Sequence, residues 1–176
     1  NSEYNCSDWA KESIDRAFNT YLLNSEKEYE FKTNISRLDF CELIFNLVVQ
    51  TPYFATWCEE NLEEDETEFP SFIEKPFVDT DDEKVLFLHH IGIVNGKSDT
   101  LFCPNDFLKR EEFAKIMCKT LELLDTEGAK VFYDVPAGSW YADFVRAASA
   151  AGIMTGTSDS KFGTGLTLSR QDLAVI

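Results

Sequence analysis

The sequence predicts a mainly α-helical fold built from three copies of one helix–loop–helix repeat. The first observation is that glycines, aspartates, aromatic residues and arginines recur along the chain at fixed spacings. The second is that apolar residues within each copy recur at intervals of three and four, which indicates amphipathic helices. The third is a helix-start pattern, an arginine followed two residues later by an acid, which precedes an apolar stretch in every copy.

The second and third copies match at several positions counted from a glycine that ends a predicted helix. Upstream of that glycine, residues 77–80 (FVDT) match residues 132–135 (FYDV). Downstream, a glycine, an aspartate, a phenylalanine and an arginine follow at four, seven, ten and eighteen residues in both copies. These are Gly96, Asp99, Phe102 and Arg110 after Gly92, and Gly156, Asp159, Phe162 and Arg170 after Gly152.

The first copy is weaker but recognisable. Trp9 stands twelve residues before Tyr21, as Trp140 stands twelve residues before Gly152. Tyr29 precedes Arg37 by eight residues, the same interval that separates phenylalanine from arginine in the other copies. This copy has lost two loop residues and both loop glycines, so we expect it to be the most diverged.

Each copy is predicted to hold two helices joined by a turn-rich loop. In the third copy the first helix is expected at about 140–151, ending at Gly152 as a left-handed C′ residue. The second helix begins near residues 168–172, with Ser169 as N-cap and Asp172 at N3. The first copy repeats this start with Ser36 and Asp39. In the second copy Lys109 takes the cap position, while Glu112 remains at N3.

These elements divide the chain into four parts. Residues 1–51 form repeat one, 52–76 an acidic connector with a short helix near 54–62, 77–131 repeat two with its connector, and 132–176 repeat three. The second helix of repeat three stops after two turns at Ile176. The acidic run in the connector is typical of a solvated surface, and we assign it no site.

Composition excludes several classes of function. With 16 basic and 32 acidic residues the net charge is −16, so nucleic acid and anionic lipid are poor partners. No stretch is long and apolar enough to span a membrane, and the polar opening residues show no signal-peptide pattern. The five cysteines lack a C-x-x-C pair, and Cys41 and Cys118 are expected to be buried thiols. We expect no disulfide framework, metal or cofactor.

The polar feature common to all copies is an arginine at the first position of the second helix: Arg37, Arg110 and Arg170. A guanidinium is unfavourable beside the positive end of a helix dipole, unless an anion lies against both. A bound carboxylate or phosphate would satisfy this requirement. An internal arginine–carboxylate pair that locks one copy to another would satisfy it equally well, and the residues alone do not distinguish the two.

Taken together, these motifs resemble the S-layer homology domain. The Thr-Arg-Ala-Glu tetrapeptide typical of that family stands here as residues 36–39 (SRLD), 109–112 (KREE) and 169–172 (SRQD). Repeat three is the best match, through residues 132–135 (FYDV), 139–142 (SWYA) and 152–156 (GIMTG). The resemblance covers nearly the whole chain except the acidic connector.

The resemblance implies a pseudo-threefold, three-pronged spindle around a central three-helix bundle. It also implies non-covalent anchoring of a larger bacterial surface protein, in cis, to the cell wall through an acidic, commonly pyruvylated, secondary polysaccharide. Localisation would be extracellular, at the wall. The residues carried over are the motif arginines Arg37, Arg110 and Arg170, Trp9 and Trp140, Gly92 and Gly152, and the motif serines Ser36 and Ser169.

Three departures limit what the resemblance implies. Repeat two lacks the tryptophan, with Val85 or Leu86 near that place, and carries Lys109 in the motif. Repeat one has Tyr21 where the pocket glycine belongs. We therefore expect at most two competent grooves, each built from neighbouring copies.

Two other classes of function are a structural or interaction module and an enzyme. A diverged repeat protein could keep the fold as a structural or protein-interaction module without the polymer. An enzyme is not expected, because His89 and His90 are adjacent and no nucleophile or phosphate-loop motif is present. Asp79, Asp81 and Asp82 resemble a calcium loop only weakly, since the glycine and terminal glutamate of an EF-hand are missing.

Overall fold

A computed structural model describes residues 4–62 and 70–175. Within these ranges the chain is helical, without β-strands beyond isolated bridges, so the predicted mainly α fold is confirmed. The elements are η1 (Asp8–Ala10), α1 (Lys11–Asn19), α2 (Arg37–Val48), α3 (Pro52–Asn61), α4 (Glu83–His90), α5 (Arg110–Thr120), α6 (Ala142–Ala150) and α7 (Arg170–Val175).

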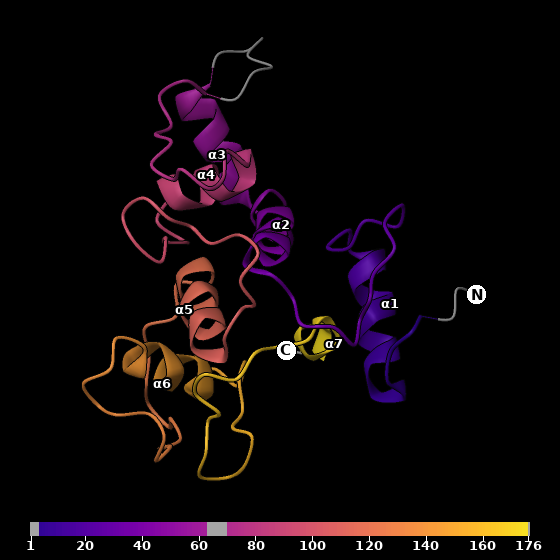
Figure 1. The fold of residues 1–176 in the computed structure, drawn as a ribbon, viewed down its shortest axis with the longest axis vertical. Helices are drawn as coiled ribbons and strands as arrows, with labels where there is room; N and C mark the ends of the chain where they lie inside the picture. Colours follow the sequence, from indigo (N-terminus) through magenta and orange to yellow (C-terminus); the bar gives the residue numbers. More distant parts are fainter. Residues whose placement is uncertain (1–3, 63–69, 176) are drawn as a thin grey trace.

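The helices group into three lobes, and each lobe combines two consecutive repeats (Figure 1). The second helix of repeat one, α2, packs against α4, the first helix of repeat two. In the same way α5 packs against α6, and α7 returns to pack against α1 and η1. The last repeat therefore packs against the first, and each site between repeats is formed by residues of two repeats.

A ring of backbone hydrogen bonds marks the pseudo-threefold axis. Ile35, Leu108 and Leu168 each stand two residues before a motif arginine and are fully buried. The Ile35 N–H donates to the Leu168 carbonyl, the Leu168 N–H to Leu108, and the Leu108 N–H to Ile35, at 3.0, 3.2 and 3.0 Å. From this ring α2 and α5 start side by side, with the Phe40 and Phe113 rings 5.3 Å apart.

A left-handed residue ends the first helix of every repeat, as predicted. Gly92 and Gly152 have φ of +78° and +73°, a conformation that glycine adopts without strain. Tyr21, aligned with them in repeat one, has φ of +59° although it carries a Cβ. Tyr21 therefore keeps the same turn as the two glycines, although it is a less favourable residue for that conformation.

The tryptophan of repeat two is missing together with its segment, which corrects one expectation. Asp79 precedes Gly92 by 13 residues, whereas Asp134 precedes Gly152 by 18, so five residues are absent. Val85 and Leu86 do not take the tryptophan's place. They lie inside α4, fully buried in the core. In repeat three, Trp140 lies in the turn before α6, so that helix begins two residues later than predicted.

The aspartate of each F-x-D motif holds the loop that leads to the second helix. Asp134 accepts hydrogen bonds from the backbone N–H groups of Phe162, Gly163 and Thr164 at 2.7 to 3.0 Å. Asp79 does the same for Phe102 and Cys103 at 2.8 and 2.7 Å. These contacts occupy a carboxylate that the calcium alternative required, and Asp82 is likewise used as the N-cap of α4.

The connector forms the predicted short helix, α3, and packs through aromatic rings. Phe54 and Trp57 lie against Phe87 of α4, with ring centroids 5.6 and 4.9 Å apart. The acidic run at residues 63–66 and 68 lies outside the described residues. Cys41 and Cys118 are buried, as expected.

Candidate functional site

Arg37 reaches from the start of α2 into the loop of repeat two and is buried there, with 5% of its surface exposed. Its Nε donates to the carbonyl of Phe102 at 3.0 Å and its Nη2 to that of Asn95 at 2.8 Å. Its Nη1 pairs with Glu112 at 3.1 Å, and the guanidinium lies 4.6 Å from the centre of the Phe102 ring. Arg37 thus binds loop, helix and aromatic anchor of the following repeat.

Arg110 makes the equivalent contacts with repeat three, but without the ion pair. Its Nε donates to Phe162 and its Nη2 to Thr155, at 2.9 and 2.7 Å. Asp172, the counterpart of Glu112, is held by the N–H and hydroxyl of Ser169 in a reciprocal capping box. Among the described residues no carboxylate pairs with Arg110, and burial lowers its pKa despite the nearby negative charge of Asp172.

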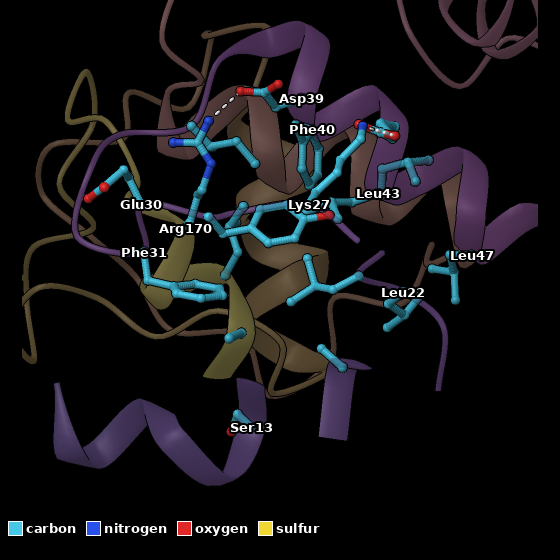
Figure 2. A pocket seen from close by; sticks show the side chains of 18 of the residues that line it. Ser13, Leu22, Lys27, Glu30, Phe31, Asp39, Phe40, Leu43, Leu47 and Arg170 are labelled. Carbon is cyan, nitrogen blue, oxygen red and sulfur yellow. Dashed lines mark hydrogen bonds and ion pairs between the residues drawn. The ribbon is translucent and has the colours of Figure 1, made fainter. Parts of the chain in front are cut away.

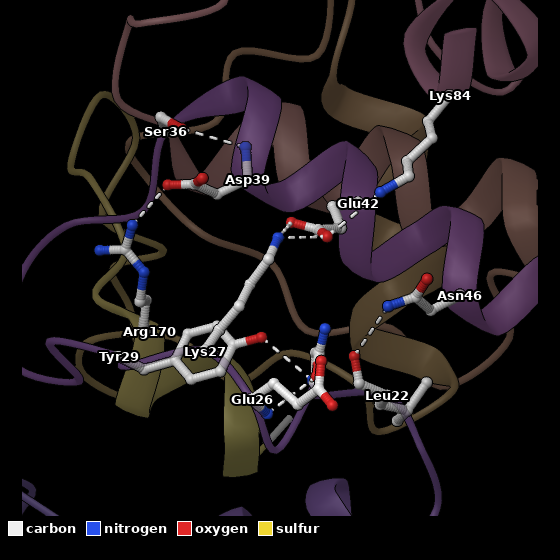
Figure 3. A network of polar contacts seen from close by, with 11 residues as sticks. Leu22, Glu26, Lys27, Tyr29, Ser36, Asp39, Glu42, Asn46, Lys84 and Arg170 are labelled. Atoms are coloured by element: carbon white, nitrogen blue, oxygen red, sulfur yellow. Dashed lines mark hydrogen bonds and ion pairs between the residues drawn. The ribbon is translucent and has the colours of Figure 1, made fainter. Parts of the chain in front are cut away.

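Arg170 completes the cycle by returning to repeat one. It donates to the hydroxyl of Thr33 at 2.7 Å and the carbonyl of Asn34 at 3.1 Å, and it pairs with Asp39 (Figures 2 and 3). In two of the three repeats the acid at N3 therefore pairs with the arginine of the preceding repeat: Glu112 with Arg37, and Asp39 with Arg170. For Arg37 and Arg170 the internal arginine–carboxylate pair is what the structure contains.

Each arginine thus defines a junction, which we name after the repeat whose loop it contacts. The first junction holds Arg170, the loop of repeat one and α2. The second holds Arg37, the loop of repeat two and α5, and the third holds Arg110, the loop of repeat three and α7. The three are equivalent by pseudo-symmetry, but they differ in shape and charge.

The second junction contains a cavity of about 410 Å³, large enough for one or two sugar rings. Four cationic side chains and two carboxylates line it, beside an exposed indole ring. These residues are Arg37, Lys97, Lys109, Lys115, Glu111, Glu112 and Trp140.

Two of the lysines that line this cavity differ in how their charge is balanced. Lys97 pairs with Glu112 at 2.6 Å. The Nζ of Lys115 instead donates to the neutral amide oxygen of Asn95 at 2.8 Å and lies 5.6 Å from the centre of the Trp140 ring. Desolvation lowers the pKa of Lys115, and the nearby charges of Lys119 and Arg37 add to that effect.

Glu112 is the hub of the second junction. It accepts from Arg37 and Lys97 through one oxygen and from the backbone N–H of Lys109 through the other. Desolvation raises the pKa of Glu112, but these donors outweigh it, so the net direction is downward. The carboxylate is therefore held ionised, and it caps α5 where Lys109 has no side-chain acceptor to offer.

Trp140 and Trp9 occupy corresponding places. Trp140 is 57% exposed and lies beside α5 of the second junction, while Trp9 is 55% exposed on η1, which packs against α7 of the third. The exposed flat face of an indole is typical of sugar-stacking positions. The first junction has no counterpart, since the tryptophan segment is absent from repeat two.

The first junction holds a wider cavity of about 810 Å³ with a mostly apolar wall (Figure 2). Phe31, Phe40 and Leu43 line its interior, and the Arg170–Asp39 pair lies at one rim. At the other rim Glu42 accepts from both Lys27 and Lys84 (Figure 3). This junction differs from the second in that each cation lining it, Arg16, Lys27 and Arg170, is paired with a carboxylate, and in that it has no indole.

The remaining predicted residues serve the backbone rather than a cavity. Ser36 caps α2 by accepting from the N–H of Asp39 at 3.0 Å, and Ser169 caps α7. Gly92 and Gly152 end α4 and α6, and Gly92 does not line the cavity of the second junction.

Sequence reasoning missed Lys97, Lys115 and Asn95. A cluster of lysines near one motif arginine in so acidic a chain was the available indication. No cluster of three metal-ligating side chains lies among the described residues, and none of their helices is long and apolar enough to cross a bilayer.

Comparison with known proteins relates the sequence of this chain to a family. The family model of the S-layer homology domain matches residues 85–114 and 131–174, within repeats two and three. The surface-layer 125 kDa protein of Lysinibacillus sphaericus is 35% identical over 94 residues, which are 53% of this chain and 8% of that protein.

Two further relatives match shorter stretches of the chain. The S-layer protein sap of Bacillus anthracis is 31% identical over 77 residues, 44% of this chain and 10% of that protein. An amylopullulanase of Thermoanaerobacterium thermosulfurigenes is 38% identical over 73 residues, 42% of this chain and 4% of the enzyme. The chain thus spans a tenth or less of these proteins. The two segments that the family model matches, in repeats two and three, are S-layer homology domain sequence.

Proposed function

We propose that this chain anchors a larger bacterial surface protein non-covalently to the cell wall by binding an acidic secondary wall polysaccharide. Its relatives include surface-layer proteins and a polysaccharide-degrading enzyme, and the shared segment is a small part of each. A module shared by proteins with such different remaining parts suits attachment rather than catalysis. The site of action would be outside the cell, at the wall.

The observation that carries the proposal is the cavity of the second junction. Its four cations exceed its two carboxylates in a chain whose net charge is −16, so the positive character is local. A sugar carboxylate, such as that of a pyruvate ketal, would accept charge-assisted hydrogen bonds from lysine. The face of the same sugar would lie against Trp140, whose ring is exposed beside Lys115.

A second candidate function is a structural or protein-interaction module that keeps the fold without the polymer. Arg37 and Arg170 favour it, because both already bind carboxylates of the neighbouring repeat. On this alternative the arginines serve assembly of the spindle alone, and the cavity of the second junction has no wall ligand.

Co-sedimentation with purified cell walls separates the two. The chain is mixed with walls of Lysinibacillus sphaericus, the source of one relative, before and after the secondary polymer is removed by mild acid. Anchoring predicts pelleting with intact walls and loss of pelleting with stripped ones. Pelleting that is absent, or indifferent to stripping, contradicts the polymer-binding function and favours the structural module.

A further inference from the structure

We infer that Lys115 selects the second junction, among the three, as the one that receives an acidic sugar. The inference rests on the proposed function for its biological meaning, since it assigns the anionic part of the wall ligand to one place. It concerns the residue five positions after each motif arginine, where the three repeats carry Lys115, Glu42 and Val175. The same backbone position therefore bears a positive, a negative and a neutral side chain.

The environment of Lys115 leaves its charge available to a ligand. Among the described residues it makes no ion pair, and its direct partner is the neutral Asn95 amide. The negative charge of Glu112 also acts on Lys115, but this carboxylate is already paired with both Arg37 and Lys97. A half-buried ammonium without a direct counter-ion gains more from an incoming carboxylate than one already paired, because its desolvation is not yet compensated.

Lys115 also lies where a sugar face and a carboxylate can be bound together. Its Nζ is 5.6 Å from the centre of the Trp140 ring, within the span of one pyranose bearing an acidic substituent. Trp140 contributes an apolar surface that either sugar can contact, and Lys115 contributes the charge that distinguishes an acidic sugar from a neutral one. Together they would bind the sugar ring and its carboxylate at one place.

The first junction reverses this arrangement (Figure 3). Glu42 occupies the position of Lys115, and its oxygens accept from Lys27 at 2.5 and 2.7 Å and from Lys84 at 3.1 Å. Both lysines are therefore engaged by a carboxylate of the protein, and an external carboxylate would have to displace it. The tryptophan segment is absent as well, so this junction lacks both parts of the pair.

The third junction is intermediate. Trp9 provides an exposed indole on η1, which packs against α7. Five positions after its motif arginine this repeat has Val175, which carries no charge, so the third junction lacks a counterpart of Lys115. We expect this junction to bind sugars with less preference for a carboxylate than the second.

The test measures two sugars and three variants of the full chain. Methyl glucuronide is the acidic probe and methyl glucoside the neutral one, with dissociation constants measured by ligand-observed NMR. Lys115→Gln removes the charge, Lys115→Arg restores it, and Lys119→Gln is the matched control at an exposed lysine one turn further along the same helix. Thermal unfolding of each variant checks that the fold is retained.

Lys115→Gln is expected to weaken glucuronide binding about tenfold, the value of one charge-assisted hydrogen bond, without changing glucoside binding. Lys115→Arg and Lys119→Gln should stay within about twofold of the unmodified chain. Glucuronide binding that is unchanged in Lys115→Gln, or no tighter than glucoside binding in the unmodified chain, overturns the inference. Lys115-dependent glucuronide binding without wall pelleting refutes the proposed anchoring and leaves the assignment of Lys115 standing.

Discussion

The first and second junctions are built from the same parts and differ in what those parts carry. Both place a motif arginine against an acid at N3 of the next helix, Arg170 against Asp39 and Arg37 against Glu112. Around that pair, the cavity of the first junction is wide and mostly apolar, and the cations that line it are paired with carboxylates. The cavity of the second junction is smaller, has more cations than carboxylates and is flanked by an indole. Pseudo-symmetry therefore preserves the arginine contacts that hold the lobes together, while the positions around them diverge.

The largest expected effect concerns the shared pair. Replacing Arg37 by alanine removes donors to two backbone carbonyls and to Glu112 at a buried site. We expect a loss of about 3 kcal/mol in the free energy of unfolding, at the lower end for a broken buried pair because Lys97 still neutralises Glu112. Urea denaturation measures it.

Arg110→Ala is the matched comparison, since Arg110 makes the same carbonyl contacts but no ion pair. It should destabilise the chain less than Arg37→Ala. If the two variants lose equal stability, the carbonyl contacts alone hold the lobes and the internal pair contributes nothing.

The next effect concerns the indole that the first junction lacks. Trp140→Ala should reduce wall binding roughly fivefold, which corresponds to the ~1 kcal/mol of an aromatic contact. Stability should change little, because the ring is mostly exposed. Pelleting titrations with intact walls measure the affinity.

Trp9→Ala makes the same change at the third junction. The unequal charges of the two sites predict a smaller loss for Trp9→Ala than for Trp140→Ala. Equal losses would show that the third junction contributes as much as the second, and a larger loss for Trp9→Ala would reverse their order.

A smaller effect is expected from the charge network of the first junction. Glu42→Gln leaves Lys27 and Lys84 without their shared carboxylate, whose side chain is 24% exposed. We expect a loss of about 0.5–1 kcal/mol in the free energy of unfolding, and no gain in wall binding, because no indole is present. Glu12→Gln is the control, since the side chains of its pair with Arg16 are 88% and 71% exposed and the pair should contribute nothing measurable. Increased wall pelleting by Glu42→Gln would show that the Glu42 charge alone keeps the first junction from binding.

The smallest effect is a pH dependence that compares repeats two and three. The N–H of Phe102 is the main cause that lowers the pKa of Asp79; desolvation opposes it, and the N–H of Cys103 adds to it. At Asp134 desolvation is the largest influence and raises the pKa, but hydrogen bonds from Phe162, Thr164 and Gly163 outweigh it. Both carboxyls thus have folded-state pKa values below their unfolded ones.

The stability that these two aspartates contribute is fully present above the unfolded pKa of about 4 and is lost as the pH falls through the lower folded value. Asp134→Asn should therefore flatten the decline of stability below pH 4. Asp79→Asn should flatten it less, because Asp79 accepts two loop hydrogen bonds and Asp134 three. Unfolding followed by circular dichroism from pH 2 to 7 measures both; an equal slope in variant and unmodified chain would contradict the clamp role.

Most of the helices and several of their caps were predictable from the sequence, because these features depend on local spacing. Gly152 after α6, Ser36 before α2 and the reciprocal pair of Ser169 and Asp172 follow from backbone preferences within a few residues. Even the degenerate first repeat could be aligned, and the left-handed Tyr21 shows that the backbone kept the turn after the glycine was lost.

The partners of the arginines were decided only by the tertiary structure. The sequence left open whether each arginine meets a bound anion or a carboxylate of another copy, and the packing of the repeats pairs Arg37 and Arg170 with the N3 acid of the next repeat. Packing of α5 on α6 brings Lys115 to Trp140, and packing of α2 on α4 brings Glu42 to Lys84. Local sequence determined where each helix begins and ends, because its causes are short-range. Which charges meet between repeats depended on packing between residues that are distant along the chain.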